Sequence, residues 1–222
     1  MLAFMSYQTE EREIAAGVAA LLGTLGIQAF MAHEHIEVSM QWRDEILRQV
    51  GLADLFVPIL SQRYYASVWC KQESGIAAFR RMTIIPLSLD GSIPQGAINH
   101  IQSTLLQGGR ATYEQILPGL ASHDVGFAIS AATQLIAGSR SFRSAEYHFQ
   151  LILPYLARAT DRQIVDLLQI SQQNGQIAHA SICAREYLPP LMRSHGHLLP
   201  ADVRADLEQV LAQYAAPPSV AR

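Results

Sequence analysis

One short segment constrains the fold of this chain more than any other. Residues 55–60, Leu-Phe-Val-Pro-Ile-Leu, form an unbroken apolar run between Asp54 and Ser61. A run of this length without polar alternation is typical of a β-strand that is buried on both faces, and such strands occur in parallel sheets covered by helices. The segment therefore predicts a central strand of an α/β domain.

The surrounding residues repeat a strand–helix alternation that agrees with this prediction. Further strands are predicted at Leu2–Ser6, Ile27–Met31 and Thr83–Leu89. Helical patterns separate them: a helix capped by Thr9 and ended by Gly26, a second over Gln41–Gly51, and a loop and helix within Ser61–Arg81. Strand–helix units of this length imply right-handed crossovers and a parallel sheet. Ligands of such sheets bind beyond the carboxyl ends of the strands, which here are the loops that start at Ser6, Met31, Ser61 and Asp90.

The second half of the chain has a different character. A weak strand near Ile101–Leu106 and helices after Ala111 complete the sheet domain, and beyond about Ser139 the pattern is helical only. Helices are predicted at Ser144–Ala157, Asp161–Gln172, Ile177–Leu188 and Ala201–Tyr214. We therefore expect an α/β domain over residues 1–137 and a small all-α region over residues 138–222.

Composition excludes several classes of protein. Half of the residues are hydrophobic, only 16% are charged, and the net charge is −3. A general nucleic-acid binder needs a basic stripe, and a disordered chain lacks this much apolar surface, so both classes are excluded. The charge is low for a soluble domain, which suggests that some of the surface is covered in use.

The compartment is predicted from two further features. Cys70 and Cys183 lie far apart and form no metal-binding or disulfide pattern, which favours a reducing cytoplasm. The uncharged stretch Ile14–Ala32 is interrupted by glycines and preceded by acidic residues, so we interpret it as a buried helix and strand. Neither a membrane span nor a signal peptide is expected.

The segment Ser67-Val-Trp-Cys-Lys-Gln-Glu73 carries the clearest chemical signal. On a helix, residues four apart share a face, so Trp69 and Glu73 project together. An aromatic plane beside a carboxylate suits a flat heteroaromatic ring attached to a sugar. The plainer alternative is that Trp69 belongs to the core and Glu73 is a solvated helix charge. Cys70 fits either a reactive thiol or a small buried side chain.

In their order along the chain, these segments resemble the Toll/interleukin-1 receptor (TIR) domain family. The matching segments are the first strand Ala3–Tyr7, the second strand Gly26–Phe30, the BB loop Ala32–Trp42, the third strand Asp54–Ser61, the S-x-W-x-x-x-E signature Ser67–Glu73 and the fourth strand Ile84–Leu87. The resemblance covers residues 1–107 well, continues loosely to about 137, and does not include the helical tail.

The resemblance implies a flavodoxin-like parallel sheet with helices on both faces. For members with this glutamate it also implies cleavage of NAD+ at the nicotinamide–ribose bond, with NAD+ as substrate and no cofactor. It assigns catalysis to Glu73, and substrate binding to Ser6, Tyr7, Gln8, Trp42, Ser61, Ser67, Trp69 and Lys71. Trp69 would stack on a ring of the substrate. A solvated helix charge is the alternative for Lys71.

The chain departs from the family pattern in two places. The BB loop lacks the glycine that usually precedes its aromatic residue, and Gln8 stands where several relatives carry a basic residue. The H-x-H pairs His33/His35 and His195/His197 lack partners at a recognised spacing, so we expect no metal site.

Three functions remain open from the sequence. The first is an enzyme that hydrolyses or cyclises NAD+, which in relatives of this kind often serves antiviral defence. The second is a non-catalytic adaptor that binds other TIR domains, and the third is a sensor that binds NAD derivatives without cleaving them. Self-association through the TIR faces and the BB loop is expected. The apolar face of the helical region is either its own core or a docking surface for a protein partner; no nucleic-acid or membrane partner is expected.

Overall fold

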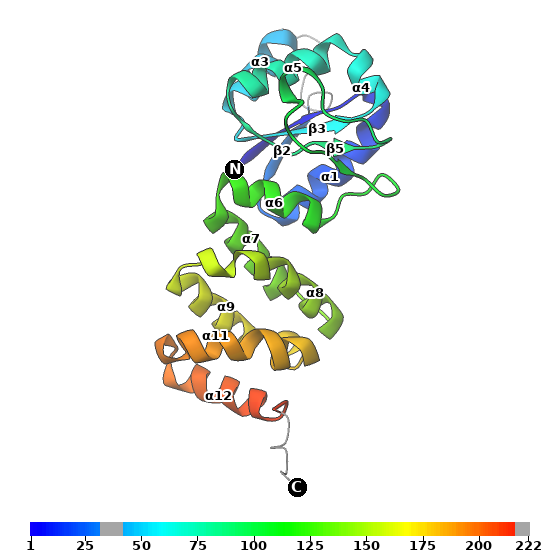
Figure 1. Cartoon of the computed structure of the whole chain (residues 1–222). Coiled ribbons are helices and arrows are strands. Elements are labelled where there is room, and N and C mark those ends of the chain that lie inside the picture. The colour runs from blue at the N-terminus through cyan, green and yellow to red at the C-terminus, as the bar shows by residue number, and fades with distance from the viewer. Residues whose placement is uncertain (32–41, 216–222) are drawn as a thin grey trace. The chain divides into compact units, whose positions relative to one another are not determined.

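The computed structural model describes residues 1–31 and 42–215, with side chains in the second range from Asp44 onward. The chain forms two compact units, Met1–His123 and Asp124–Arg222 (Figure 1). The sequence pattern predicts this boundary fourteen residues later, at 137/138. The difference is helix α7 (Val125–Ala137), whose apolar face joins the core of the second unit through Ile129 and Ile136.

The first unit is built on a parallel sheet. Its strands are β1 (Leu2–Ser6), β2 (Gln28–Met31), β3 (Leu55–Leu60), β4 (Thr83–Ile84), β5 (Leu87–Ser88) and β6 (Thr104–Leu105). In the described residues they run in the order β2-β1-β3-β5-β6, with β4 also paired to β3, and each of these pairs is parallel. Every residue of β3 is buried. The predicted α/β class, the flavodoxin-like order and the central position of residues 55–60 are confirmed.

The predicted strand Thr83–Leu89 is in fact two short strands on one line. Both β4 and β5 pair with β3 at the same offset, Leu55 with Thr83 and Ile59 with Leu87. That offset places Pro58 opposite Pro86. Because proline has no N–H group to donate, the ladder of hydrogen bonds that joins β3 to residues 83–88 is interrupted at this point, which separates β4 from β5.

Helices cover both faces of the sheet. Figure 1 shows α3 (Trp42–Leu52) and α5 (Val68–Phe79) on one side of the strands, and α1 (Arg12–Thr24) and α6 (Tyr113–His123) on the other. Under α3 and α5, the ring of Phe4 stacks on those of Phe30 and Phe56, with centroids 5.6 and 6.1 Å apart. Ile46 and Val50 of α3 belong to the same cluster.

Two predicted helices differ in detail from the structure. The capping role predicted for Thr9 is wrong, because Gln8 precedes a 3₁₀ turn, η1 (Thr9–Glu11), that leads into α1. The segment 61–81 holds two helices, α4 (Gln62–Ala66) and α5, with a break at the extended residue Ser67. The predicted end of α1 is confirmed, since Gly26 has a φ of 74°, a conformation that favours glycine.

The second unit is helical throughout its described residues. It contains α7, α8 (Phe142–Ile152), α9 (Asp161–Gln173), α10 (Gly175–Ala178), α11 (Leu188–His195) and α12 (Ala201–Ala212), the 3₁₀ turns η3 (Leu153–Arg158) and η5 (Gly196–Leu198), and the π-helical turn η4 (Cys183–Tyr187). The helix predicted at Ile177–Leu188 is therefore in pieces. The apolar face predicted for this region, including Leu151, Ile164 and Leu168, is buried, and most of it packs in one core.

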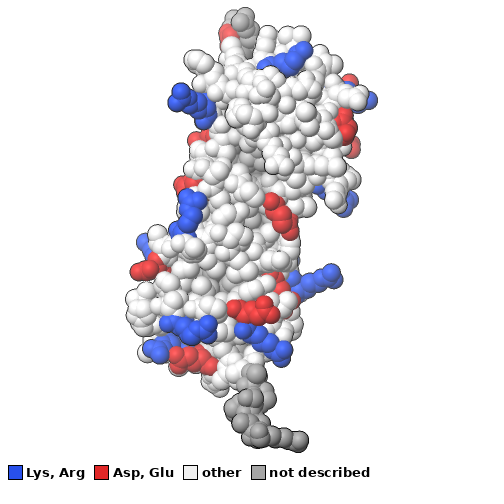
Figure 2. Space-filling model, in the orientation of Figure 1, with Lys and Arg blue, Asp and Glu red and all other residues white. Residues whose placement is uncertain are grey.

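The surface agrees with the low charge of the sequence. Figure 2 shows a face on which most side chains are neither acidic nor basic. Within the described ranges, no helix is long and apolar enough to cross a membrane.

Candidate active site

Glu73 is a buried carboxylate at the carboxyl edge of the sheet. It lies on α5, and only 6% of its surface is exposed. Ser6, the last residue of β1, donates a hydrogen bond from Oγ to Oε2 of Glu73 over 2.5 Å. The alternative interpretation of Glu73 as a solvated helix charge is therefore wrong.

Burial changes the acidity of this group. It raises the pKa of Glu73 from 4.5 to about 7, because an ionised carboxylate loses its hydration there. The hydrogen bond from Ser6 acts in the opposite direction, since it favours the ionised form and lowers the pKa. A carboxyl group balanced near neutral pH in a cleft is a candidate for a chemical role.

A buried tyrosine connects Ser6 to α5. The hydroxyl of Tyr64 lies 3.0 Å from Oγ of Ser6 and 2.8 Å from Oγ of Ser74, and it also reaches the carbonyl of Cys70 at 3.2 Å. Burial raises the pKa of Tyr64 well above its usual value. Tyr64 thus holds the first strand, α4 and α5 together around Glu73. Nothing in the sequence pattern singled out Tyr64 or Ser74.

A groove runs past Glu73 along helices α3 and α5. Its volume is about 390 Å³, and its wall includes Trp69, Glu73, Ile46, Leu47, Ile76 and Phe79. The predicted shared face of Trp69 and Glu73 is present, and Trp69 is half-buried beside the carboxylate. A flat ring fits a wall made of an indole and aliphatic side chains.

Four other predicted site residues are not among those that line this groove: Tyr7, Gln8, Ser67 and Lys71. Tyr7 is buried, and the side-chain amide of Gln8 donates to Sγ of Cys70 at 3.2 Å. Burial raises the pKa of the Cys70 thiol, which disfavours a reactive thiolate. Ser67 caps α5 by accepting a hydrogen bond from the Cys70 N–H at 3.3 Å. Lys71 is exposed and does not line the groove.

Two predictions lie outside the described structure. The BB loop, including His33 and His35, falls in residues 32–41, and for Trp42 the structure gives its position as the first residue of α3 and no side chain.

A second serine–glutamate pair lies at the same sheet edge. Ser61, directly after β3, donates a hydrogen bond to Oε1 of Glu11 and also caps α4 by accepting the Tyr64 N–H at 3.0 Å. Glu11 is 6% exposed and also accepts from the backbone N–H of Gln8 at 3.3 Å. The sequence pattern alone shows Glu11 only as one of the acidic residues in the first helical turn after β1. Its partner Ser61 therefore has a structural role that joins two loops.

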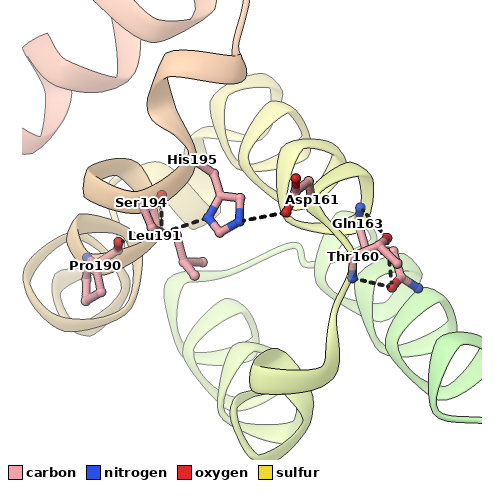
Figure 3. A network of polar contacts seen from close by, with 7 residues as sticks. All are labelled: Thr160, Asp161, Gln163, Pro190, Leu191, Ser194 and His195. Atoms are coloured by element: carbon pink, nitrogen blue, oxygen red, sulfur yellow. Dashed lines mark hydrogen bonds and ion pairs between the residues drawn. The ribbon is translucent and has the colours of Figure 1, made fainter.

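The second unit contains a serine, a histidine and an aspartate in line, which Figure 3 shows between α11 and α9. Oγ of Ser194 lies 2.7 Å from Nδ1 of His195, and Nε2 of His195 lies 3.4 Å from Asp161. Oγ of Ser194 also lies within hydrogen-bond distance of the carbonyl of Pro190 on its own helix, at 3.0 Å. Asp161 is 82% exposed. This arrangement links two helix ends and is not a hydrolytic triad.

Metal binding finds no support in the described residues. Among them, no three His, Cys, Asp or Glu side chains are grouped closely enough to hold an ion. His195 contacts Ser194 and Asp161, whereas His197 lines a different surface of the second unit.

Comparison with known proteins gives one clear match. A family model described as the TIR domain matches residues 3–117, a little over half of the chain. The matched range contains the sheet, Glu73 and the groove, and it ends within α6. No curated protein matches the chain significantly.

Proposed function

This chain belongs to the TIR domain family, and on that premise we propose that it cleaves NAD+ at the nicotinamide–ribose bond, with Glu73 as the catalytic residue. The observation that carries the proposal is the position of Glu73, a buried carboxylate that borders a groove beside Trp69 at the carboxyl edge of a parallel sheet.

The reaction needs few protein groups. The bond between ribose C1′ and the pyridinium nitrogen breaks, and its electron pair leaves with nicotinamide, which departs as a neutral molecule without a general acid. Positive charge develops at C1′, and the carboxylate of Glu73 stabilises it. Water then attacks C1′ and loses a proton to give ADP-ribose. Attack by an adenine nitrogen instead gives a cyclic ADP-ribose isomer.

The environment of Glu73 supports this role. A pKa of about 7 leaves a substantial fraction of the carboxyl group ionised at neutral pH, and the positive charge of a bound pyridinium ring favours the ionised form further. Trp69 offers a stacking surface for nicotinamide or adenine in the same groove. The substrate is NAD+ itself, and the proposal includes no cofactor.

Assembly is the second part of the proposal. TIR domains commonly self-associate, and the rim of this groove exposes apolar side chains, with Phe79 89% exposed and Leu47 38% exposed. We propose that copies of the first unit associate through this rim and through the BB loop. An enzyme activated by assembly fits a cytoplasmic role in antiviral defence, and the free, buried Cys70 and Cys183 fit a reducing compartment.

The experiment is to incubate the purified full chain with NAD+ at high protein concentration and to follow free nicotinamide by chromatography. The variant Glu73→Ala is compared with Glu13→Ala, a matched change at an exposed glutamate. The proposal is supported if the wild type and Glu13→Ala release nicotinamide and Glu73→Ala does not. Mass analysis of the second product distinguishes hydrolysis from cyclisation.

The rival functions give different results in the same experiment. A sensor binds NAD+ in calorimetry and releases no nicotinamide at any protein concentration. An adaptor associates with TIR domains and neither binds nor cleaves NAD+. Either outcome, in a sample shown by sedimentation to be assembled, overturns the proposed cleavage.

A further inference from the structure

The second unit carries a groove that the proposed NAD+ chemistry does not use. It has a volume of about 1130 Å³ and lies along η4, α11 and α12. Its floor is apolar: Met192 and Leu211 are half-buried against the core of the unit. The ring of Tyr214 is fixed beside them, because its hydroxyl donates to the carbonyl of His179 at 3.1 Å.

The rim of this groove is basic. Arg185, Arg193, Arg204 and His197 line it, against a single acidic side chain, Glu208. Arg204 and Glu208 pair with each other at 2.7 Å and so neutralise one another. Among the described residues, Arg185 and Arg193 have no acidic partner within ion-pairing distance, and both are exposed. Figure 2 shows both basic and acidic side chains over α11 and α12 on the face drawn.

The local backbone brings the two arginines to one surface. Arg185 lies on the π-helical turn η4, and Arg193 lies near the end of the α-helix that follows. A π turn holds more residues than an α turn, so it rotates the preceding side chains relative to those that follow. Such turns recur at functional sites. Here the turn accompanies two guanidinium groups on the wall of one groove, each able to bind a carboxylate through two hydrogen bonds.

We propose that this groove binds an acidic segment of a partner protein, with apolar side chains on the groove floor and carboxylates on Arg185 and Arg193. The charge of the rim selects an anionic partner, and the apolar floor selects one that also carries apolar anchors. The volume of about 1130 Å³ and the exposure of Arg185 and Arg193 favour a peptide, because sites for small molecules enclose most of the ligand in about 300–1,000 Å³. An amphipathic acidic helix matches both features. This inference stands apart from the proposed cleavage of NAD+.

Fluorescence polarisation with defined peptides tests the inference on the full chain. Four labelled amphipathic peptides of about four helical turns are compared, each with one residue type on its polar face and one on its apolar face. The polar and apolar residues are Glu and Leu, Glu and Ala, Gln and Leu, and Lys and Leu. We expect the Glu–Leu peptide to bind at least tenfold more tightly than the other three, with affinity that falls as salt rises. Equal binding of the Glu–Leu and Gln–Leu peptides, or no binding of the Glu–Leu peptide, would overturn the inference.

Variants locate the binding. The double variant Arg185→Glu/Arg193→Glu is expected to weaken binding of the Glu–Leu peptide at least tenfold. The matched control is Arg143→Glu/Arg162→Glu, which changes two exposed arginines of the same unit outside the groove. We expect this control to change the affinity for the Glu–Leu peptide less than twofold. Equal losses in the two double variants contradict the proposed place. Arg185→Gln/Arg193→Gln replaces the first variant if circular dichroism shows that it fails to fold.

Inorganic pyrophosphate is the probe for the alternative of a small phosphorylated ligand. If pyrophosphate binds the chain in calorimetry and the Glu–Leu peptide does not bind, the groove recognises phosphate and the proposed peptide partner is rejected.

Discussion

Ser6 donates a hydrogen bond to Glu73 over 2.5 Å, although 67 residues separate them along the chain. The bond joins the carboxyl end of β1 to the second turn of α5. It has two consequences for the carboxylate. It fixes one of the two oxygens, and it partly offsets the cost of ionising a group that is 6% exposed.

Replacing Ser6 with alanine should shift the pH dependence of NAD+ cleavage. The hydrogen bond from Ser6 lowers the pKa of Glu73, so its loss raises that pKa above the value of about 7 in the wild type. Because cleavage needs the carboxylate, log kcat/KM of the wild type should rise with pH up to about 7 and then level off. In Ser6→Ala the rise should extend to higher pH. Ser6→Thr, which retains the hydroxyl, should restore the wild-type profile; an unshifted profile in Ser6→Ala would contradict this role.

Stability should also depend on pH through Glu73. A carboxyl group whose pKa is raised on folding binds its proton more tightly in the folded state, so its contribution is complete below pH 4.5 and is lost as pH rises through about 7. Relative to Glu73→Gln, the free energy of unfolding of the wild type should therefore fall by about 3 kcal/mol over that window. Urea titrations followed by tryptophan fluorescence test this, because Trp42 and Trp69, the two tryptophans of the chain, both lie in the first unit. Parallel curves for the two proteins would contradict the burial argument.

The second serine–glutamate pair should matter for stability more than for chemistry. Ser61→Ala removes both the cap of α4 and the hydrogen bond to the buried Glu11, so we expect a loss of about 2 kcal/mol in the free energy of unfolding. Ser67→Ala is the control, because Ser67 caps α5 without holding a buried carboxylate, and its loss should be about 1 kcal/mol. A smaller cost for Ser61→Ala than for Ser67→Ala, in the same urea titration, would count against the structural role of the pair.

Phe79 should contribute to self-association. Its side chain is 89% exposed at the rim of the groove, so Phe79→Ser is expected to leave folding unchanged and to weaken association at least tenfold in sedimentation velocity. Phe142→Ser makes the same change at a half-exposed phenylalanine of the second unit and should leave association unchanged. Equal behaviour of the two variants would show that the rim of the groove is not the interface.

The sequence predicted the elements whose signals are local. The strand at residues 55–60 was recognisable because all six of its residues are apolar, and the pairing of Trp69 with Glu73 follows from helix geometry alone. Tyr64 could not be predicted in this way, because its role depends on its approach to Ser6, 58 residues away in the chain.

Other features depended on tertiary partners in the same way. The apolar face of α7 is compatible with packing on either unit, and only its contacts with the second unit decide the boundary. The break in the fourth strand follows from Pro58 and Pro86 facing each other, which requires the register of the sheet. The predictions for the BB loop and the Trp42 side chain concern residues outside the described structure and stay predictions.

The central claim is that the carboxylate of Glu73 carries NAD+ cleavage. The most direct measurement is the rate of nicotinamide release by wild type and by Glu73→Gln, side by side at the same high protein concentration. Glutamine preserves the shape of the side chain and an acceptor for Ser6, and it removes the charge. We expect the rate to fall by about three orders of magnitude, the scale on which loss of a transition-state electrostatic partner acts. A Glu73→Gln protein that releases nicotinamide within tenfold of the wild-type rate would contradict the account.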